Sequence, residues 1–263
     1  KKIYIPRFYG IERYGLPKKC DISSGDSISL EFPKTLRDYQ TDIVNIYINY
    51  VNRQISDSEE AFPGYGGILE VPCGRGKTVM ALKIISLLQK KTLIIVHKEF
   101  LMNQWIERIE EFLPGARVGK IQGPTFDVEN NDIVIGMLQT LYDKEFPLDA
   151  FSSFGMTIVD EVHRIGSEQF SKTLLKTVTP YMLGISATVD RKDNLTRVLY
   201  MFIGPKIYSE ERDDEDQVVV QAIEYKTGDD DFNEVLLDYV GSPKYSSMIS
   251  KISNYGPRSD FIL

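Results

Sequence analysis

The segment Val71–Thr78 (Val-Pro-Cys-Gly-Arg-Gly-Lys-Thr) constrains the fold most strongly, because it joins a short apolar strand to a helix. Gly74 and Gly76 allow successive backbone N–H groups to turn toward an anion, and the start of the following helix carries a partial positive charge. This is the pattern of a phosphate-binding loop, although a valine stands where the usual form has its first glycine. A plain surface turn is the alternative interpretation, and the strand before and the helix after favour the phosphate loop.

Short apolar runs alternate with amphipathic stretches through the middle of the chain. This alternation predicts an α/β fold in which a parallel sheet is covered by helices on both faces. Ligands of such sheets bind at the carboxyl ends of the strands. The expected strands are Ile68–Val71, Thr92–Val96, Ala116–Ile121, Asp132–Met137, Met156–Val159 and Met182–Ser186, and the expected helices are 35–52, Lys77–Gln89, Glu99–Leu113 and Ser167–Val178.

The chain is expected to have three parts. Residues 1–34 are rich in Gly, Pro and Lys and predict a small appendage, with strands at Ile3–Ile5 and Ser27–Phe32. Residues 35–205 form the α/β domain. Residues 206–263 begin with an acidic linker, after which the pattern predicts a strand at Val218–Tyr225 and helices at Phe232–Val240 and Tyr245–Ile252.

Composition favours a soluble intracellular protein. Of the 263 residues, 42% are hydrophobic and 26% are charged, which is ordinary for a globular protein. No apolar run reaches the roughly 18 residues that span a bilayer, and the N-terminus lacks the apolar core of a secretory signal. Two cysteines cannot form a disulfide framework, and two histidines make a structural zinc site unexpected. We expect the cytoplasm or the nucleus, or a virion if the source is viral.

The net charge of −7 does not decide whether the chain binds nucleic acid. Residues 210–234 contain eleven acidic and two basic residues, a local charge of −9, so the rest of the chain carries +2. Local patches rather than the total charge govern contact with a phosphate backbone. The acidic total therefore neither supports nor excludes DNA or RNA as a partner.

Two carboxylates follow the apolar strand that ends at 159, in the sequence Asp-Glu-Val-His. We expect Asp160 and Thr78 to hold Mg²⁺, and Lys77 to reach the β- and γ-phosphates of ATP. Glu161 would position or deprotonate the attacking water, and His163 would connect the site to neighbouring loops. A solvated strand end is the alternative, and the phosphate loop in the same sheet favours ATP hydrolysis.

Four segments, in order and spacing, resemble the motifs of the DEAD/DEAH-box motors of helicase superfamily two. Their first domain is a RecA-like P-loop NTPase fold, so the resemblance implies this fold for residues 35–205. The matching segments are Leu36–Gln40 (adenine-reading segment), Gly74–Thr78 (first motif), Asp160–His163 (second motif) and Gly184–Thr188 (Ser-Ala-Thr box).

The run Thr188–Asp193, followed by Gly204 and Pro205, looks like one branch of this superfamily. That branch contains the xeroderma pigmentosum group B helicase, phage repair helicases and helicases of large DNA viruses. The resemblance therefore implies a DNA helicase or double-stranded DNA translocase, with DNA favoured over RNA, and it suggests a viral origin.

The resemblance also implies roles for residues around the nucleotide. Gln40 would read the N6 and N7 atoms of adenine, and Arg37 would support it. Arg75, together with the two loop glycines, would contact the nucleotide. Ser186 and Thr188 would couple the nucleotide state to the nucleic-acid face, whereas a simple cap after a strand is their alternative role.

Nucleic-acid contacts are expected from two further loops at the same sheet edge. Lys98 in the loop after 92–96 is the candidate phosphate ligand, and Gln139 and Thr140 are candidates in the second loop. An ordinary solvated lysine is the alternative for Lys98. The family contacts the backbone more than the bases, so affinity should fall with salt. Trp105 is expected in the core rather than as a stacking platform.

These motors clamp ATP between two RecA-like domains, and the second domain supplies an arginine finger. The finger's Gln-x-x-Gly-Arg-x-x-Arg pattern is absent here, and residues 218–263 resemble only the start of a second domain. We therefore expect the front half of a longer motor, weakly active alone. Alternatives are the motor of a restriction or remodelling complex, and an ATP-binding scaffold without motor activity.

Overall fold

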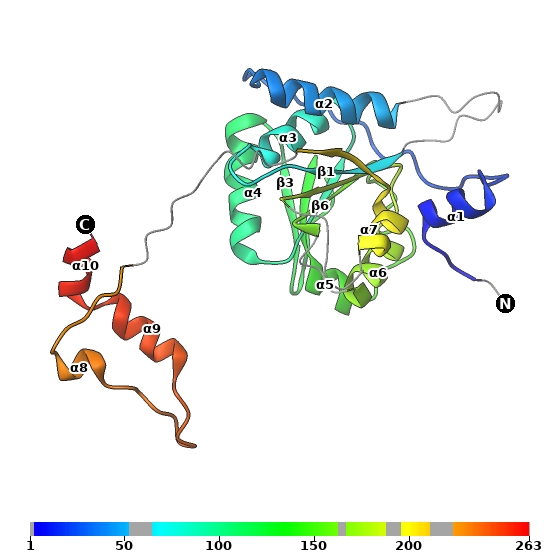
Figure 1. Cartoon of the computed structure of the whole chain (residues 1–263). Coiled ribbons are helices and arrows are strands. Elements are labelled where there is room, and N and C mark those ends of the chain that lie inside the picture. The colour runs from blue at the N-terminus through cyan, green and yellow to red at the C-terminus, as the bar shows by residue number, and fades with distance from the viewer. Residues whose placement is uncertain (1–2, 53–64, 163–166, 188–195, 211–222, 263) are drawn as a thin grey trace. The chain divides into compact units, whose positions relative to one another are not determined.

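The computed structural model describes residues 3–52, 65–162, 167–187, 196–210 and 223–262. The chain divides into two compact units, residues 1–212 and 213–263 (Figure 1). The expected boundary at residue 206 differs from this division, because residues 206–209 form a strand of the first unit.

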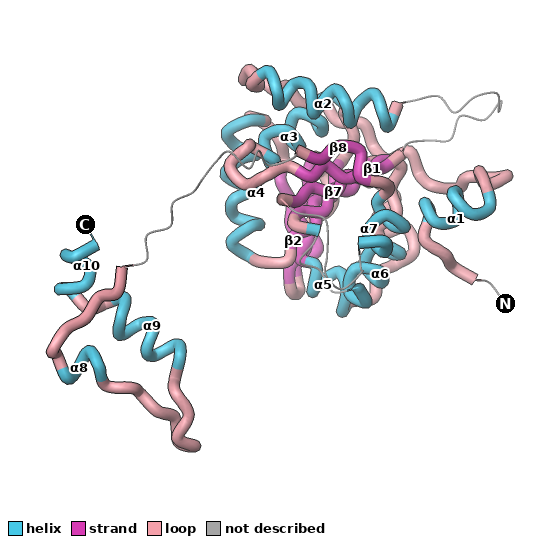
Figure 2. Tube along the Cα trace, viewed as in Figure 1, coloured by secondary structure: helices cyan, strands magenta, loops and turns pink. Residues whose placement is uncertain are grey.

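The first unit is built on an eight-stranded sheet in the order β4-β3-β5-β2-β6-β7-β1-β8. The strands of this sheet are magenta in Figure 2. All neighbours are parallel except β3 and β4. The central strands are apolar runs that are buried along their length, as expected for a sheet covered on both faces. The strands are β1 (Gly66–Glu70), β2 (Thr92–Val96), β3 (Val118–Gln122), β4 (Thr125–Phe126), β5 (Ile133–Met137), β6 (Met156–Asp160), β7 (Tyr181–Ser186) and β8 (Lys206–Ser209).

Helices cover both faces of this sheet and confirm the predicted fold class (Figure 1). Alternate residues of each strand enter opposite cores, so Ile94 packs with Trp105 and its neighbour Leu93 packs with Phe170. None of the helices in the described ranges is both long and apolar enough to cross a bilayer. One face carries α2 (Asp38–Val51), α3 (Lys77–Leu88) and α4 (Glu99–Phe112), and the other carries α5 (Leu138–Asp143), α6 (Ser167–Lys176) and α7 (Thr196–Ile203).

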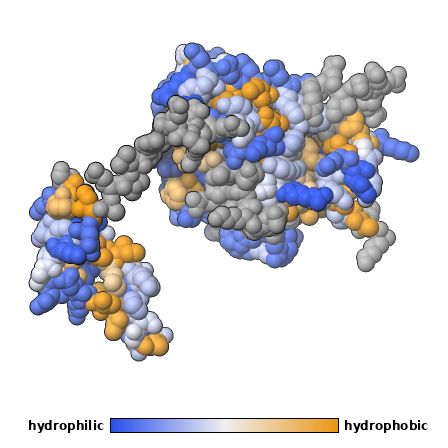
Figure 3. Space-filling model, in the orientation of Figure 1, coloured by the Kyte–Doolittle hydropathy of each residue, from blue (hydrophilic) through white to orange (hydrophobic). Residues whose placement is uncertain are grey.

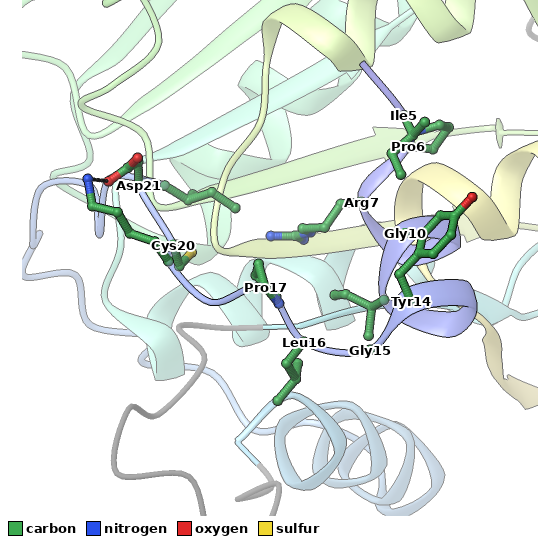
Figure 4. Close-up of a pocket in the computed structure, with 13 residues that line it drawn as sticks. Ile5, Pro6, Arg7, Gly10, Tyr14, Gly15, Leu16, Pro17, Cys20 and Asp21 are labelled. Carbon is green, nitrogen blue, oxygen red and sulfur yellow. Dashed lines mark ion pairs between the residues drawn. The ribbon is translucent and has the colours of Figure 1, made fainter. Parts of the chain in front are cut away.

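Within the first unit, the N-terminal segment packs through α1 (Arg7–Tyr14), which contacts α7. Nη1 of Arg7 donates to the backbone oxygens of Thr179 and Pro180, at 2.8 and 3.2 Å. A mostly apolar cavity of about 390 Å³ lies between α1 and residues 15–22 (Figure 4). The strand expected at Ile3–Ile5 is wrong, since these residues are irregular and lead directly into the helix.

The strand expected at Ser27–Phe32 is also wrong. Only Ser27 forms an isolated bridge, with Lys90. At Leu30 the side chain of Gln89 takes the place of a neighbouring strand, because its amide accepts from the Leu30 N–H at 3.0 Å and donates to the Leu30 carbonyl at 2.8 Å. This stretch is therefore extended but makes no ladder.

The second unit contains α8 (Asp230–Asn233), α9 (Tyr245–Ser253) and α10 (Gly256–Ile262). Its aromatic side chains cluster, and the rings of Phe232 and Tyr255 are 4.5 Å apart. Several large apolar side chains remain exposed, as the orange patches on this unit show (Figure 3). The exposed apolar side chains of this unit include Leu237, Val240 and Ile249.

Of the three elements expected in this region, one is wrong, one lies mostly outside the described residues and one is confirmed. The helix expected at Phe232–Val240 ends at Asn233, and Leu237 instead bridges to Pro243. Of the strand expected at 218–225, residues 218–222 lie outside the described ranges and residues 223–225 form no strand. The helix expected at Tyr245–Ile252 is confirmed as α9.

Candidate nucleotide site and nucleic-acid edge

A cavity of about 630 Å³ opens at the carboxyl edge of the sheet, between the phosphate loop, the start of α2 and one face of α4. It collects most of the residues predicted to hold the nucleotide. From the predicted set, the cavity is lined by Arg37, Gln40, Gly74, Gly76, Lys77, Thr78, Asp160 and Glu161.

The phosphate loop has the backbone geometry that an anion site requires. Gly74 and Gly76 both have φ of +81°, in the left-handed region that favours glycine. α3 begins at Lys77, so its first unpaired N–H groups face the cavity together with the side chains of Lys77 and Thr78. The loop can therefore cradle phosphate oxygens with backbone donors, a lysine and a hydroxyl.

Both ends of the Gln40 amide are hydrogen-bonded, one to this loop and the other to the residue that precedes α2. Nε2 donates to the Arg75 carbonyl at 3.0 Å, and Oε1 accepts from the Arg37 backbone N–H at 3.1 Å. A Cβ atom at Gly76 would lie only 2.4 Å from Nε2 of Gln40. Reading adenine, the role predicted for Gln40, would use the second N–H of Nε2 and the second lone pair of Oε1.

The side chain of Arg75 turns to the protein rather than to the cavity wall. Its guanidinium lies 4.0 Å from the ring centroid of Tyr39 and forms an ion pair with Glu210. The Glu210 hydrogen bond raises the pKa of Arg75. Tyr39 also donates its hydroxyl to the Arg75 carbonyl at 3.2 Å. Among the residues predicted to contact the nucleotide, Arg75 is thus engaged with Tyr39 of α2 and with Glu210, which follows β8.

Asp160 is the last residue of β6 and is only 6% exposed. Nε1 of Trp105 donates to its Oδ2 at 2.9 Å. Burial raises the pKa of Asp160, while the Trp105 hydrogen bond and the charge of Lys77 act in the opposite direction. A buried carboxylate that has few protein donors and a lysine nearby is suited to bind a hard cation beside a phosphate.

Glu161 lies beside Asp160 in a backbone conformation that side chains rarely adopt. Its φ is +51°, and a non-glycine residue in the left-handed region costs roughly 1–2 kcal/mol. Strain of this kind persists where the surrounding structure enforces it, often at functional sites. The turn places Glu161 in the cavity wall. His163, predicted to join this site to other loops, lies outside the described residues.

The strand order brings all the predicted functional segments to one edge. β1, β7, β6, β2 and β5 are consecutive neighbours, so the phosphate loop, the end of β7, the acidic pair and the two nucleic-acid loops follow in that order. Ser186 ends β7 and is fully buried, and its backbone oxygen accepts from the Val71 N–H at 2.9 Å. Thr188, its predicted coupling partner, is outside the described residues.

The candidate nucleic-acid residues lie on the far part of this edge. Lys98 caps α4, and its Nζ is 5.9 Å from the ring centroid of Phe100, which is 55% exposed. In α5, Gln139 donates to Asp143 at 2.6 Å, and the Thr140 hydroxyl accepts from the backbone of the β3–β4 turn at 3.0 Å. The two loops are close because β2 and β5 are paired.

Sequence reasoning missed the contribution of α4 to the nucleotide cavity. Spacings of three and four residues put these side chains on one face of the helix, which is the signal that could have identified them. The polar side chains on that face line the same cavity as the phosphate loop. The α4 residues in the cavity wall are Leu101, Gln104, Glu107, Arg108 and Phe112.

Comparison with known proteins places the chain in a family. Residues 33–191 match the family described as "Type III restriction enzyme, res subunit". A protein of Acanthamoeba polyphaga mimivirus, provisionally named ATP-dependent RNA helicase L396, is 32% identical over 99% of this chain and 49% of its own length. The DNA 3'-5' translocase XPB2 of Sulfurisphaera tokodaii is 30% identical over 77% of this chain and 43% of its own length. The chain thus spans about half or less of the length of these relatives.

Solved structures share the fold. The UvsW helicase from bacteriophage T4 matches 70% of this chain and 64% of its own, with a TM-score of 0.54 and 21% identity. The SWI2/SNF2 ATPase core of Sulfolobus solfataricus, solved in complex with double-stranded DNA, matches 69% of this chain and 38% of its own, with a TM-score of 0.51 and 17% identity. The chain therefore belongs to the type III restriction enzyme res subunit family of superfamily-two helicases, and its first unit is the RecA-like domain of that family.

Proposed function

We propose that this chain is the ATP-binding half of a motor that uses ATP hydrolysis to move on nucleic acid, with duplex DNA as the preferred track. One observation carries the proposal: Lys77 and Thr78 of the phosphate loop line the same cavity as Asp160 and Glu161. A phosphate cradle and a carboxylate pair in one cavity are the parts that phosphoryl transfer to water requires.

The residues fit a magnesium–nucleotide complex. Mg²⁺ typically takes one or two protein oxygens and completes its shell with phosphate oxygens and water. Thr78 and Asp160 would supply those protein oxygens, and bound Mg²⁺ would neutralise charge on the β- and γ-phosphates. Lys77 would contact the same phosphates from the loop side. Glu161 would orient the attacking water or accept its proton.

The other predicted residues have proposed roles outside the magnesium–nucleotide site. Ser186 lies between the phosphate loop and the acidic pair in the sheet order, which suits a role in coupling the two sites. Lys98, Gln139 and Thr140 would grip the nucleic-acid backbone. A second RecA-like domain of the same protein would supply the arginine finger. The first unit alone would therefore bind nucleotide but turn it over slowly.

Nucleotide binding tests the first part of the proposal. Lys77→Ala should weaken binding of a fluorescent ADP analogue (MANT-ADP) by at least about tenfold, since it removes a charge-assisted contact. Lys83→Ala is the matched control, because Lys83 is on the same helix and outside the cavity wall, with its Nζ 5.1 Å from the ring centroid of Phe32. Equal binding by all three proteins would contradict the proposed site.

Turnover by the full-length protein tests the motor and its track. ATPase activity should be stimulated most by duplex DNA, less by single strands and least by RNA. Glu161→Gln should abolish turnover while nucleotide still binds. Unchanged activity in Glu161→Gln would contradict the catalytic assignment and favour a scaffold. Stronger stimulation by RNA would overturn the DNA preference but leave the motor intact.

A further inference from the structure

We propose that Trp105 is a positioning residue that holds the Asp160 carboxylate in its metal-binding orientation. This inference rests on the proposed function, since it concerns how the magnesium site is organised. The sequence predicted only that Trp105 lies in the core, whereas this inference gives its indole N–H a role at the metal site.

The contact is a buried hydrogen bond between residues 55 positions apart, with 2.9 Å between Nε1 of Trp105 and Oδ2 of Asp160. Trp105 is 1% exposed and Asp160 is 6% exposed, so water does not compete strongly for either group. An indole N–H can only donate, and an ionised carboxylate can only accept. Such charge-assisted bonds are shorter and stronger than neutral ones, and a bond that is also buried defines an orientation.

Both partners of the Trp105–Asp160 hydrogen bond are held in place by the surrounding structure. Trp105 belongs to the core cluster that packs α4 against the sheet, with Ile94 and Ile158 among its members. Asp160 is fixed at the end of β6 by pairing with β7. The backbone N–H of Glu161 also favours the ionised carboxylate and so lowers the pKa of Asp160. One oxygen of Asp160 is therefore fixed by a side chain that cannot move without disturbing the core.

A purely structural role makes a different prediction from a positioning role. If Trp105 only fills the core, removing its N–H while keeping its shape changes little at the metal. If it positions Asp160, the same change loosens the metal ligand and leaves the phosphate cradle intact. Loss of a partner that orients a metal ligand typically costs 10–100-fold in metal affinity.

The chain offers an unusually clean test because Trp105 is its single tryptophan. Expression in a tryptophan auxotroph can replace it with β-(benzothien-3-yl)alanine, which has nearly the same shape but no N–H. 5-Fluorotryptophan keeps the N–H and serves as the matched control. The measurement is the anisotropy of MANT-ADP, excited directly, as MgCl₂ is added and again in EDTA.

The benzothienyl protein should need about tenfold more Mg²⁺ for half-maximal tightening of MANT-ADP binding. Its affinity in EDTA should equal that of the unmodified protein, and the fluorotryptophan protein should match the unmodified one in both conditions. An unchanged Mg²⁺ requirement, or an equal loss of affinity in EDTA, would overturn the positioning role alone. If the unmodified protein shows no Mg²⁺-dependent binding, the proposed function fails and this inference fails with it.

Discussion

Replacing Gly76 with alanine should damage the phosphate loop in two separable ways. The residue has φ of +81°, so any Cβ strains the backbone. In addition, that Cβ would lie 2.4 Å from Nε2 of Gln40 and would displace its amide. Gly74 is the matched control, because it has the same φ but no atom within 4 Å of its added Cβ.

The expected loss in the free energy of unfolding can be worked out for each glycine substitution from the contacts in the structure. A left-handed alanine costs roughly 1–2 kcal/mol, and this should be the whole effect of Gly74→Ala. Displacing the Gln40 amide also removes its bonds to Arg37 and Arg75, each worth about 0.5–1.5 kcal/mol. Gly76→Ala should therefore lower the free energy of unfolding by roughly 2–5 kcal/mol. In a Gln40→Ala background the clash disappears, and only the backbone cost should remain.

Urea unfolding followed by the emission of Trp105, which is buried in the first unit, measures these changes. The coupling between Gly76→Ala and Gln40→Ala should be about 1–3 kcal/mol, and between Gly74→Ala and Gln40→Ala close to zero. MANT-ADP affinity should fall more for Gly76→Ala than for Gly74→Ala. If the two glycine substitutions cost the same and neither depends on Gln40, the described contact does not govern the loop.

Three other predictions concern stability and nucleic-acid binding. Tyr47→Phe should cost about 1–2 kcal/mol in urea unfolding, because the fully buried hydroxyl donates to the Met182 carbonyl at 2.9 Å; no loss would mean that the bond is replaced. The Arg117 hydrogen bonds lower the pKa of Asp132 from its ordinary value, so the stability lost in Asp132→Asn should be constant near neutral pH and should shrink only as pH falls below about 4, the pKa of an unfolded Asp; a loss that grows on acidification would contradict this sign. Lys98→Ala should weaken binding to every duplex sequence alike and reduce the salt slope by about 1, measured by anisotropy between 50 and 200 mM salt; an unchanged slope would remove Lys98 from the interface.

The sequence predicted the sheet well where local signals were strong. Thr92–Val96 was placed without error, since the apolar run is bounded by polar residues on both sides. α5 was missed because it begins immediately after β5, with no capping residue or breaker to mark it. The strand predicted at Ser27–Phe32 failed because its hydrogen-bond partner at Leu30 is the side chain of Gln89, a contact that no local pattern encodes.

The residues that line the candidate site could be predicted from motifs, but the hydrogen bonds and ion pairs that join them to distant residues could not. Motifs on β1 and β6 indicated that Lys77 and Asp160 would share a cavity, and the structure brings both into its wall. The bond from Trp105 to Asp160 was not foreseen, because periodicity reveals which face of α4 is buried but not which polar atom meets it. Likewise, nothing near Arg75 in the sequence indicated its pairing with Glu210 after β8.

The unbroken parallel register from β5 through β2, β6 and β7 to β1 has a mechanical consequence. Neighbouring strands are about 4.8 Å apart and cannot slide without rupturing buried ladder bonds. The pairing therefore fixes the distance along the carboxyl edge from the phosphate loop to the start of α5, where Gln139 lies. Movement in the proposed motor cycle would therefore come from segments attached to this edge, because the distance between its strands is fixed.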